Sequence, residues 1–345
     1  MLNRETIGKN TNKRIKRDKR RFLSKAGLLC CFLLWAQTSW AAQKILLVIG
    51  QDTRDYAMTR QVFKVGLDLA VKQKGQSIEW LELKQIGENK QEFIDNLKEM
   101  EDDIDLVFVA GTPTAMSVLE SGINKPVLFA AVANPKKANL VNNLHSPGRN
   151  FTGAYCAVSA NRQLQTVLSY LPKTKNITIV YNPFDPAPAA QVEDWSKAIS
   201  ILKNSDIRLS KIKIPEQVNS SQAMLEFMNT IDPTMDVLIT TADAKIANYG
   251  SEIIQFAIRN KVPMYSSLNS LVEEGALFSL GFKFKEAAQQ ISVSQAIKIL
   301  NGVLPKDIPV GTLPEYSLVF NLKTAQQIGI EFSEKIIESA DELIQ

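Results

Sequence analysis

Histidine and cysteine are scarce in this sequence, and their scarcity removes several kinds of active site. The 345 residues include one histidine, His145, and three cysteines. A single imidazole cannot build the usual histidine-based metal clusters, and it leaves only one candidate imidazole base. His145 lies in the polar stretch NNLHSPGRN, which is typical of a surface loop.

The short signatures of nucleotide-binding and hydrolytic enzymes are also missing. The chain has no G-x-x-x-x-G-K-[ST] phosphate loop, no G-x-G-x-x-G after its first expected strand and no G-x-S-x-G elbow. We therefore expect a protein that is not an enzyme and that uses no metal or other cofactor. An exported hydrolase is the least favoured alternative.

Positive charge is concentrated at the N-terminus. Residues 1–41 hold ten of the 40 basic residues and two of the 36 acidic ones, so the rest of the chain carries about −4 against +4 for the whole. This balance gives no support to a nucleic-acid partner. The basic stretch is followed by an apolar segment at 26–36 and by small residues at Ser39 and Ala41. We predict a signal peptide cleaved after about Ala41 and a periplasmic or other extracytoplasmic location; an uncleaved anchor or a basic arm is the alternative.

Cleavage at that position would leave Cys156 as the one cysteine. One thiol cannot form an internal disulfide, so the fold must depend on its apolar core. Cys156 lies in the strand-like run FTGAYCAVS, where it is either a buried small hydrophobic residue or a reactive thiol.

Strand-like and helix-like segments alternate after the leader. A strand buried on both faces is expected at 44–50, an alternating strand at 77–83 and further strands at 105–110 and 126–132, with helices at about 53–74 and 90–100. In the first helix, the spacing of Val62, Val65 and Leu69 predicts one apolar face. Such alternation is typical of α/β folds with parallel sheets and helices on both faces.

The same pattern occurs twice along the chain. The segment 176–185 resembles the first strand and its turn, and 235–245 resembles 104–114. Ile45 and Leu106 are 61 residues apart, and Ile177 and Val237 are 60 apart. We therefore predict two doubly wound parallel-sheet lobes joined by a hinge with several crossovers and a cleft. The expected boundaries are 42–153 plus about 283–305 for the N-terminal lobe, and 154–282 plus about 306–345 for the C-terminal lobe.

Polar residues follow the strands in both halves, where α/β proteins hold ligands. The turn Thr112–Ala115 offers two hydroxyls and backbone N–H groups at a helix start, which suit an anion or which simply cap the helix. Asp52, Asp185 and Asp243 each follow a strand and are either helix caps or ligand contacts. Asn134 ends another strand. Aromatic residues near strand ends are candidates for ligand stacking, although such residues more often belong to the core: Tyr155, Tyr181, Phe184, Tyr265 and Phe282.

An ordered set of motifs resembles a known family. GTPTA, KPVLFAAVANP, NFTGAY, IVYNPFDPAPAAQVE, LITTADAKI, GALFSLGF and VFNLKTAQQIGIE follow one another across about 43–342. Together they resemble the extracytoplasmic substrate-binding proteins of ABC transporters, in particular relatives that bind aromatic amino acids such as tryptophan. The resemblance implies a type I periplasmic-binding fold with a three-segment hinge and a ligand clamped between the lobes.

The family's binding loops correspond to two groups of residues in this chain. In the first lobe they are Gln51, Asp52, Thr112, Pro113, Thr114, Ala115 and Asn134, and in the second lobe Tyr155, Asn182, Asp185, Asp243, Ser266 and Ser267. The chain departs from the family pattern where polar or acidic residues are usual, at Ala187, Pro188, Ala244, Leu268, Ser270 and Lys283. Asp185 and Asp243 remain as candidate counter-charges for a ligand ammonium group.

Two functions fit these observations. The first is a solute-binding protein, expected to be a monomer, that closes on a small polar or aromatic, amino-acid-like metabolite and presents it to an ABC permease. The second is a sensor or interaction component that uses a degenerate cleft to signal to a membrane partner. A bound molecule that raises the melting point would favour the first function, and capture of a membrane sensor the second.

Overall fold

The computed structural model describes residues 42–345 apart from 51–52, 86–88, 203–205 and 315. The predicted signal peptide therefore lies outside the described residues, as do Gln51 and Asp52. Gln43–Gln345 form one compact unit by their contacts. Within the described part of the chain, no helix is long and apolar enough to cross a bilayer.

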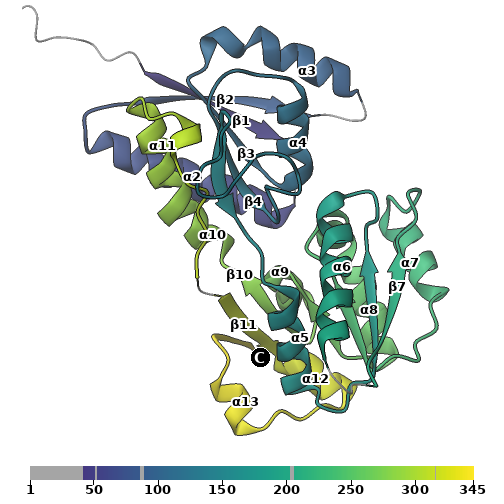
Figure 1. Ribbon diagram of the computed structural model, residues 1–345. Coiled ribbons are helices and arrows are strands. Elements are labelled where there is room, and N and C mark those ends of the chain that lie inside the picture. The colour runs from purple at the N-terminus through teal and green to yellow at the C-terminus, as the bar shows by residue number, and fades with distance from the viewer. Residues whose placement is uncertain (1–41, 51–52, 86–88, 203–205, 315) are drawn as a thin grey trace, which may run out of the picture. The chain divides into compact units, whose positions relative to one another are not determined.

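The first lobe is built on a five-stranded parallel sheet in the order β2-β1-β3-β4-β5 (Figure 1). Its strands in chain order are β1 (Gln43–Ile49), β2 (Ile78–Lys84), β3 (Leu106–Ala110), β4 (Val127–Val132) and β5 (Phe151–Tyr155). Its helices are α2 (Arg54–Lys72), α3 (Lys90–Glu99) and α4 (Thr112–Glu120), with the short turn η1 (Glu101–Asp103). β3 and β4 are wholly buried and β1 is buried over its four residues 45–48, as expected for strands covered by helices on both faces.

The second lobe is built on a seven-stranded sheet in the order β12-β11-β10-β9-β8-β6-β7. Its strands are β6 (Asn176–Tyr181), β7 (Arg208–Lys213), β8 (Val237–Thr240), β9 (Met264–Ser266), β10 (Phe278–Phe282), β11 (Tyr316–Asn321) and β12 (Glu342–Ile344). Its helices are α5 (Ala160–Tyr170), α6 (Pro186–Ile201), α7 (Ser221–Asn229), α8 (Ala244–Arg259), α9 (Asn269–Glu274), α12 (Leu322–Ile328) and α13 (Glu334–Glu338). The sheet is parallel except at β10 and β11, which pair antiparallel.

The repeat seen in the sequence corresponds to equivalent strand pairs. Ile45 lies opposite Leu106 in the first sheet, and Ile177 lies opposite Val237 in the second. Each pair is held in the same way at its start. The Asp105 carboxylate accepts from the Lys44 N–H at 2.7 Å, and the Asp236 carboxylate accepts from the Asn176 N–H at 2.7 Å. The prediction of two similar α/β halves is confirmed.

The predicted apolar face of the first helix was wrong. Val65 is 46% exposed and Leu69 is 60% exposed, whereas Phe63, Leu67 and Val71 are buried. Phe63 stacks on Phe108 of β3, with ring centroids 3.8 Å apart. Two apolar stripes with helical spacing compete in this helix, and the stripe that carries the large aromatic ring packs on the sheet.

Segments from the end of the chain return to the first lobe. α10 (Phe284–Ala287), the π-helical turn η2 (Ala288–Ser292) and α11 (Val293–Leu300) lie beside α2, although more than 200 residues separate them (Figure 1). Their apolar side chains join the core formed by Phe63 and Leu67. The chain thus passes between the lobes after β5, after β10 and again before β11.

The crossovers are tied together by one side chain and by strand-like pairing. The Gln295 amide group donates to the carbonyl oxygens of Gly153, at 3.1 Å, and Pro309, at 2.9 Å. After the turn η3 (Pro305–Asp307), Gly311 bridges β5 at Ala154. Gly311 thus pairs with the edge strand of the first sheet. The lobe boundaries given above stay a prediction.

Candidate ligand-binding site

A cavity lies where the carboxyl ends of the strands of both sheets meet, and we call it the first chamber. Its volume is about 430 Å³ when the part that is open to solvent is included. The first lobe contributes Thr53, Asp55, Tyr56, Thr112, Ala131 and Ala133, and the second lobe contributes Asp185, Ala187, Ala242, Asp243, Ala247 and Leu268. Cys156 and Phe284 line it from the crossovers after β5 and β10.

Asp243 is the most deeply buried acid of the first chamber. It is 3% exposed and precedes α8 as its N-cap. Its carboxylate accepts from the Ile246 N–H at 3.0 Å and from the Thr241 hydroxyl at 2.8 Å. Burial raises its pKa to about 7 in spite of these hydrogen bonds, and the nearby Asp185 also acts in the upward direction. The ligand-free chamber therefore disfavours a charged Asp243.

Asp185 and Asp55 share this environment. Asp185 is the N-cap of α6, accepts from the Ala187 N–H at 2.9 Å and has a pKa raised by burial. Asp55 lies in the first turn of α2, and burial raises its pKa more than the Ser270 hydrogen bond and the Arg54 charge lower it. No Lys, Arg or His side chain lines this chamber within the described residues. Three carboxyl groups therefore face a space without a basic side chain.

Tyr56 and Cys156 are neutral groups in this acidic surrounding. Burial raises the pKa of both, and the neighbouring Cys156, Asp185 and Asp243 raise that of Tyr56 further. Tyr56 keeps its phenolic proton and is a hydrogen-bond donor. Cys156 keeps its thiol proton, which is the opposite of the lowered pKa found in nucleophilic cysteines.

The three carboxyl groups are not arranged for metal binding. Within the described residues, no group of three or more His, Cys, Asp or Glu side chains could hold a metal ion. A ligand that satisfies these acids would therefore supply a cationic or hydrogen-donating group of its own.

Backbone strain is located at the chamber wall. Ala131 has a φ of 53°, in the left-handed region, at the point where the register between β4 and β5 shifts. Gly111, the N-cap of α4, has a φ of 96°. A Cβ atom at Gly111 would lie 2.7 Å from the Tyr56 ring, so the ring packs directly on the bare backbone there. Such strain is common at ligand sites.

We expect Gly111→Ala to weaken ligand binding, because the new methyl group would displace Tyr56 from the wall. Together with the positive φ, the clash should cost about 1–3 kcal/mol of stability. Gly122→Ala is the matched control, since Gly122 also has a positive φ of 69° but nothing within 4 Å of a Cβ atom. Chemical denaturation and calorimetry would measure both effects. Equal affinities for the two variants would contradict the role of the Tyr56 contact.

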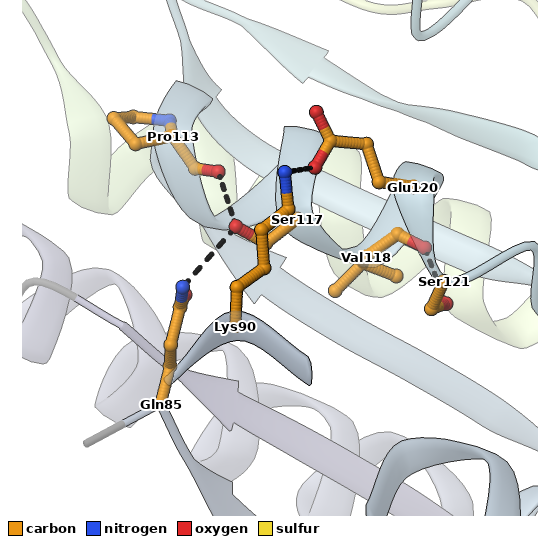
Figure 2. A network of polar contacts seen from close by, with 7 residues as sticks. All are labelled: Gln85, Lys90, Pro113, Ser117, Val118, Glu120 and Ser121. Atoms are coloured by element: carbon orange, nitrogen blue, oxygen red, sulfur yellow. Dashed lines mark hydrogen bonds and ion pairs between the residues drawn. The ribbon is translucent and has the colours of Figure 1, made fainter. Parts of the chain in front are cut away.

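Helix α4 is held in the first lobe by polar contacts (Figure 2). Gln85 donates to the Ser117 hydroxyl at 3.2 Å, and Ser117 donates to the Pro113 carbonyl at 3.3 Å. Lys90, at the start of α3, pairs with Glu120 at the end of α4. These contacts fix the helix whose N-terminus, at Thr112, faces the first chamber.

Three side-chain contacts join the lobes around the chamber. Ser270 of α9 donates to the Asp55 carboxylate at 2.8 Å, and Arg54 lies 2.6 Å from Glu273. On another side, Lys137 lies 3.6 Å from Asp194 of α6. The two lobes are therefore in contact across the cleft, and Asp55 takes part in both the chamber and the interlobe contact.

Comparison with known proteins identifies the family. The model of the family described as "ABC transporter substrate binding protein" matches residues 46–344. The chain belongs to this family. A tyrosine-binding protein of Clostridioides difficile is 28% identical over 237 residues, which is 68% of this chain and just under two thirds (66%) of that protein.

Solved structures agree on the fold of this substrate-binding protein. An ABC domain from Streptococcus pneumoniae in complex with L-Trp superposes with a TM-score of 0.77 at 22% identity, covering 88% of this chain and all of the other. A conserved domain protein from Vibrio cholerae has a TM-score of 0.77 at 26% identity, with the same coverage. The predicted type I periplasmic-binding fold is confirmed.

The residues predicted from the sequence are distributed over several places. Thr112, Asp185 and Asp243 line the first chamber, while Asn134 and Ser267 line a neighbouring cavity. Pro113 and Asn182 line a more open groove that has residues of both lobes in its walls and shares Asp185 with the first chamber. The others lie elsewhere: Thr114 packs on Gly50, Ala115 is in the core of the first lobe, Tyr155 packs at its edge, and Ser266 accepts from the Leu268 N–H beneath the second-lobe turn.

Several lining residues were not predicted as binding residues. Thr53, Asp55 and Tyr56 lie at the start of α2, directly after the turn that was expected to carry Gln51 and Asp52. Their position after the carboxyl end of a buried strand could have predicted this, since helix starts at such turns commonly contact ligands. Cys156 lines the chamber although it was considered mainly as a core residue.

Proposed function

We propose that this substrate-binding protein captures an α-amino acid with an aromatic side chain between its lobes and delivers it to an ABC permease. The observation that carries the proposal is the charge of the first chamber. Asp55, Asp185 and Asp243 line it without a basic side chain among the described lining residues. A ligand with an ammonium group would supply the missing positive charge.

The raised pKa of Asp243 indicates that a positive charge beside this carboxyl group would be favourable. A buried carboxylate without a counter-charge is costly, and an opposite charge within a few ångströms favours the ionised form. An ammonium group beside Asp243 would thus lower the pKa of this carboxyl group from about 7. By the same linkage, the ionised form of Asp243 would bind the ammonium group more tightly than the protonated form. Binding and ionisation of this acid should therefore be coupled.

The opposite wall suits a carboxylate. Helix α4 begins at the first chamber with the uncharged cap Gly111 and has no acid in its first turn, so its N-terminal dipole is available to an anion, whereas the first turn of α2 already carries Asp55. The Thr112 hydroxyl oxygen accepts from the Ala133 N–H at 3.4 Å, which leaves its proton for a ligand oxygen. A zwitterionic ligand would place its carboxylate toward the start of α4 and its ammonium group toward the acids.

The aromatic side chain is proposed from the relatives. One relative is named for binding tyrosine, and the structure from Streptococcus pneumoniae holds L-Trp. The interlobe contacts made by Arg54, Asp55 and Lys137 support a clamp that closes on its ligand. We also propose that the chain is exported, with the leader removed after about Ala41, and that it acts as a monomer.

Native mass spectrometry of the protein purified from producing cells tests this proposal. We expect one amino acid per chain, released by denaturation, and a raised melting temperature when L-tyrosine or L-tryptophan is added to ligand-free protein. A sugar or an anion without an amino group as the co-purified molecule, with no response to amino acids, would overturn it.

A further inference from the structure

One hydrogen bond joins a chamber acid to the opposite lobe, and we call this bond the latch. Asp55 Oδ2, in α2 of the first lobe, accepts from the Ser270 hydroxyl, in α9 of the second lobe, at 2.8 Å. Asp55 lines the first chamber, and both residues line a further cavity of about 700 Å³ that is partly open to solvent. The two cavities share Asp55 and Phe284. The latch therefore lies where the first chamber borders this outer space.

The donor of the latch is fixed on the second lobe. Ser270 is 8% exposed and is the second residue of α9. The preceding Asn269 accepts from the Ser279 hydroxyl of β10 at 2.6 Å. The Val272 carbonyl accepts from the Asn321 side chain of β11 at 2.8 Å. Because these bonds hold the short helix on its sheet, Ser270 moves together with the second lobe.

The acceptor of the latch is fixed on the first lobe. Asp55 belongs to the first turn of α2, and its backbone carbonyl accepts from the Thr59 hydroxyl at 2.7 Å. The neighbouring Tyr56 packs on the backbone at Gly111. Since each end is held by its own lobe, the latch forms only over a narrow range of lobe separations. A movement of about 1 Å along the bond would break it.

The latch uses one of the two carboxylate oxygens of Asp55. The other oxygen, Oδ1, makes no hydrogen bond with the residues that the structure describes. Because the side chain lines the first chamber, this oxygen is available to a hydrogen-bond donor of the ligand. A ligand held there would contact a carboxylate that is already bonded to the opposite lobe.

The other two side-chain contacts between the lobes are more exposed than the latch. Roughly half of each side chain is exposed in both pairs, Arg54 with Glu273 and Lys137 with Asp194. Exposed ion pairs contribute little to stability, because water and salt screen them. The buried hydroxyl group of Ser270 therefore makes the contact that depends most strongly on closure of the cleft.

We propose that Ser270 is a positioning residue for ligand binding, which holds the Asp55 carboxylate against the second lobe and so couples capture of the ligand to closure. The part that concerns the ligand rests on the proposed function. A ligand ammonium group at Asp55 Oδ1 favours the ionised carboxylate, and an ionised acceptor strengthens the latch. In the ligand-free protein the latch alone holds the lobes together for part of the time.

Binding kinetics of L-tyrosine test the positioning role. In Ser270→Ala the affinity should fall about ten- to a hundredfold, the range for one hydrogen bond to a charged group. The loss should lie in a faster off-rate, since the latch forms after the lobes close, while the on-rate changes less than about threefold. Ser270→Thr keeps a hydroxyl group and should restore most of the affinity. An on-rate that rises as much as the off-rate would show that Ser270 merely obstructs the exit, and would overturn the positioning role.

Two further variants show whether Ser270 acts through Asp55. Ser251→Ala is the matched control, because the Ser251 hydroxyl of α8 also donates to a carboxylate, that of Glu274 at 3.1 Å, but within the second lobe. It should bind L-tyrosine like the wild-type protein. In protein that already carries Asp55→Ala, adding Ser270→Ala should change the affinity less than about twofold. Independent effects of the two substitutions would contradict the latch.

Small-angle X-ray scattering of the ligand-free protein tests the latch without any ligand. The radius of gyration of Ser270→Ala should exceed that of the wild-type protein, and Ser251→Ala should keep the wild-type value. Unchanged L-tyrosine affinity in Ser270→Ala would overturn the inference and leave the proposed function standing. If the wild-type protein binds no amino acid, the proposed function fails. A larger radius in Ser270→Ala would then still support the latch, and an unchanged radius would overturn it as well.

Discussion

Replacing Asp243 with asparagine is expected to lower the affinity for L-tyrosine at least about a hundredfold. The substitution keeps the size of the side chain and its ability to cap α8, because asparagine also accepts from the Ile246 N–H. It removes the charge that would face the ligand's ammonium group in a buried site. Truncating one partner of such a pair costs about 2–5 kcal/mol.

Asp95→Asn provides the control for this experiment. It is the same substitution on the exposed face of α3, where the Asp95 carboxylate accepts a hydrogen bond from Gln91 within that helix. Calorimetry should give wild-type affinity for that variant. An affinity within threefold of wild type for Asp243→Asn would mean that Asp243 does not hold the ammonium group.

Asp243→Asn is also expected to stabilise the ligand-free protein against unfolding at alkaline pH. The pKa of Asp243 is raised from 3.8 to about 7 in the folded protein, so between these values the folded state keeps a proton that the unfolded state has lost. The stability of the wild-type protein therefore falls as pH rises through this window, and the full cost of the buried charge is present above pH 7. That cost amounts to up to about 4 kcal/mol.

Urea unfolding of ligand-free wild type and Asp243→Asn at several pH values between 4 and 9 checks this prediction. The variant should be more stable at pH 8, and the difference should shrink as pH falls toward 4, because wild-type Asp243 is then protonated in the folded state and close to its pKa of 3.8 in the unfolded state. A difference that is constant across this range would show that Asp243 has an ordinary pKa. Loss of affinity together with gain of stability would identify Asp243 as a residue kept for binding.

The alternating pattern of the sequence was sufficient to predict the fold, since strands buried on both faces are short apolar runs with clear ends. The pairing of Ile45 with Leu106 and of Ile177 with Val237 follows from the same spacing. The packing face of α2 was not predictable from periodicity, because the Val65–Leu69 and Phe63–Leu67 stripes both have helical spacing. Only the position of Phe108 on β3 decides between them.

The residues that line the cavity were harder to predict from the sequence than the fold. An acid in the first turn of a helix, such as Asp55, is usually explained by the helix dipole, and its contact with Ser270 joins residues 215 positions apart. The alanines that line the first chamber carry no sequence signal, since their contribution is the space they leave. Asp185 and Asp243 were chosen from their position after strands, and both line the first chamber; their role in binding stays a prediction.

The affinity of the des-amino analogue of L-tyrosine, in which hydrogen replaces the ammonium group, tests the central claim most directly. Calorimetry on the wild-type protein should show this analogue binding at least about a hundredfold more weakly than L-tyrosine. In Asp243→Asn the difference between the two compounds should become much smaller, because the most deeply buried of the three carboxyl groups is gone. Equal affinities for the two compounds in the wild-type protein would contradict an acidic chamber that holds a ligand ammonium group.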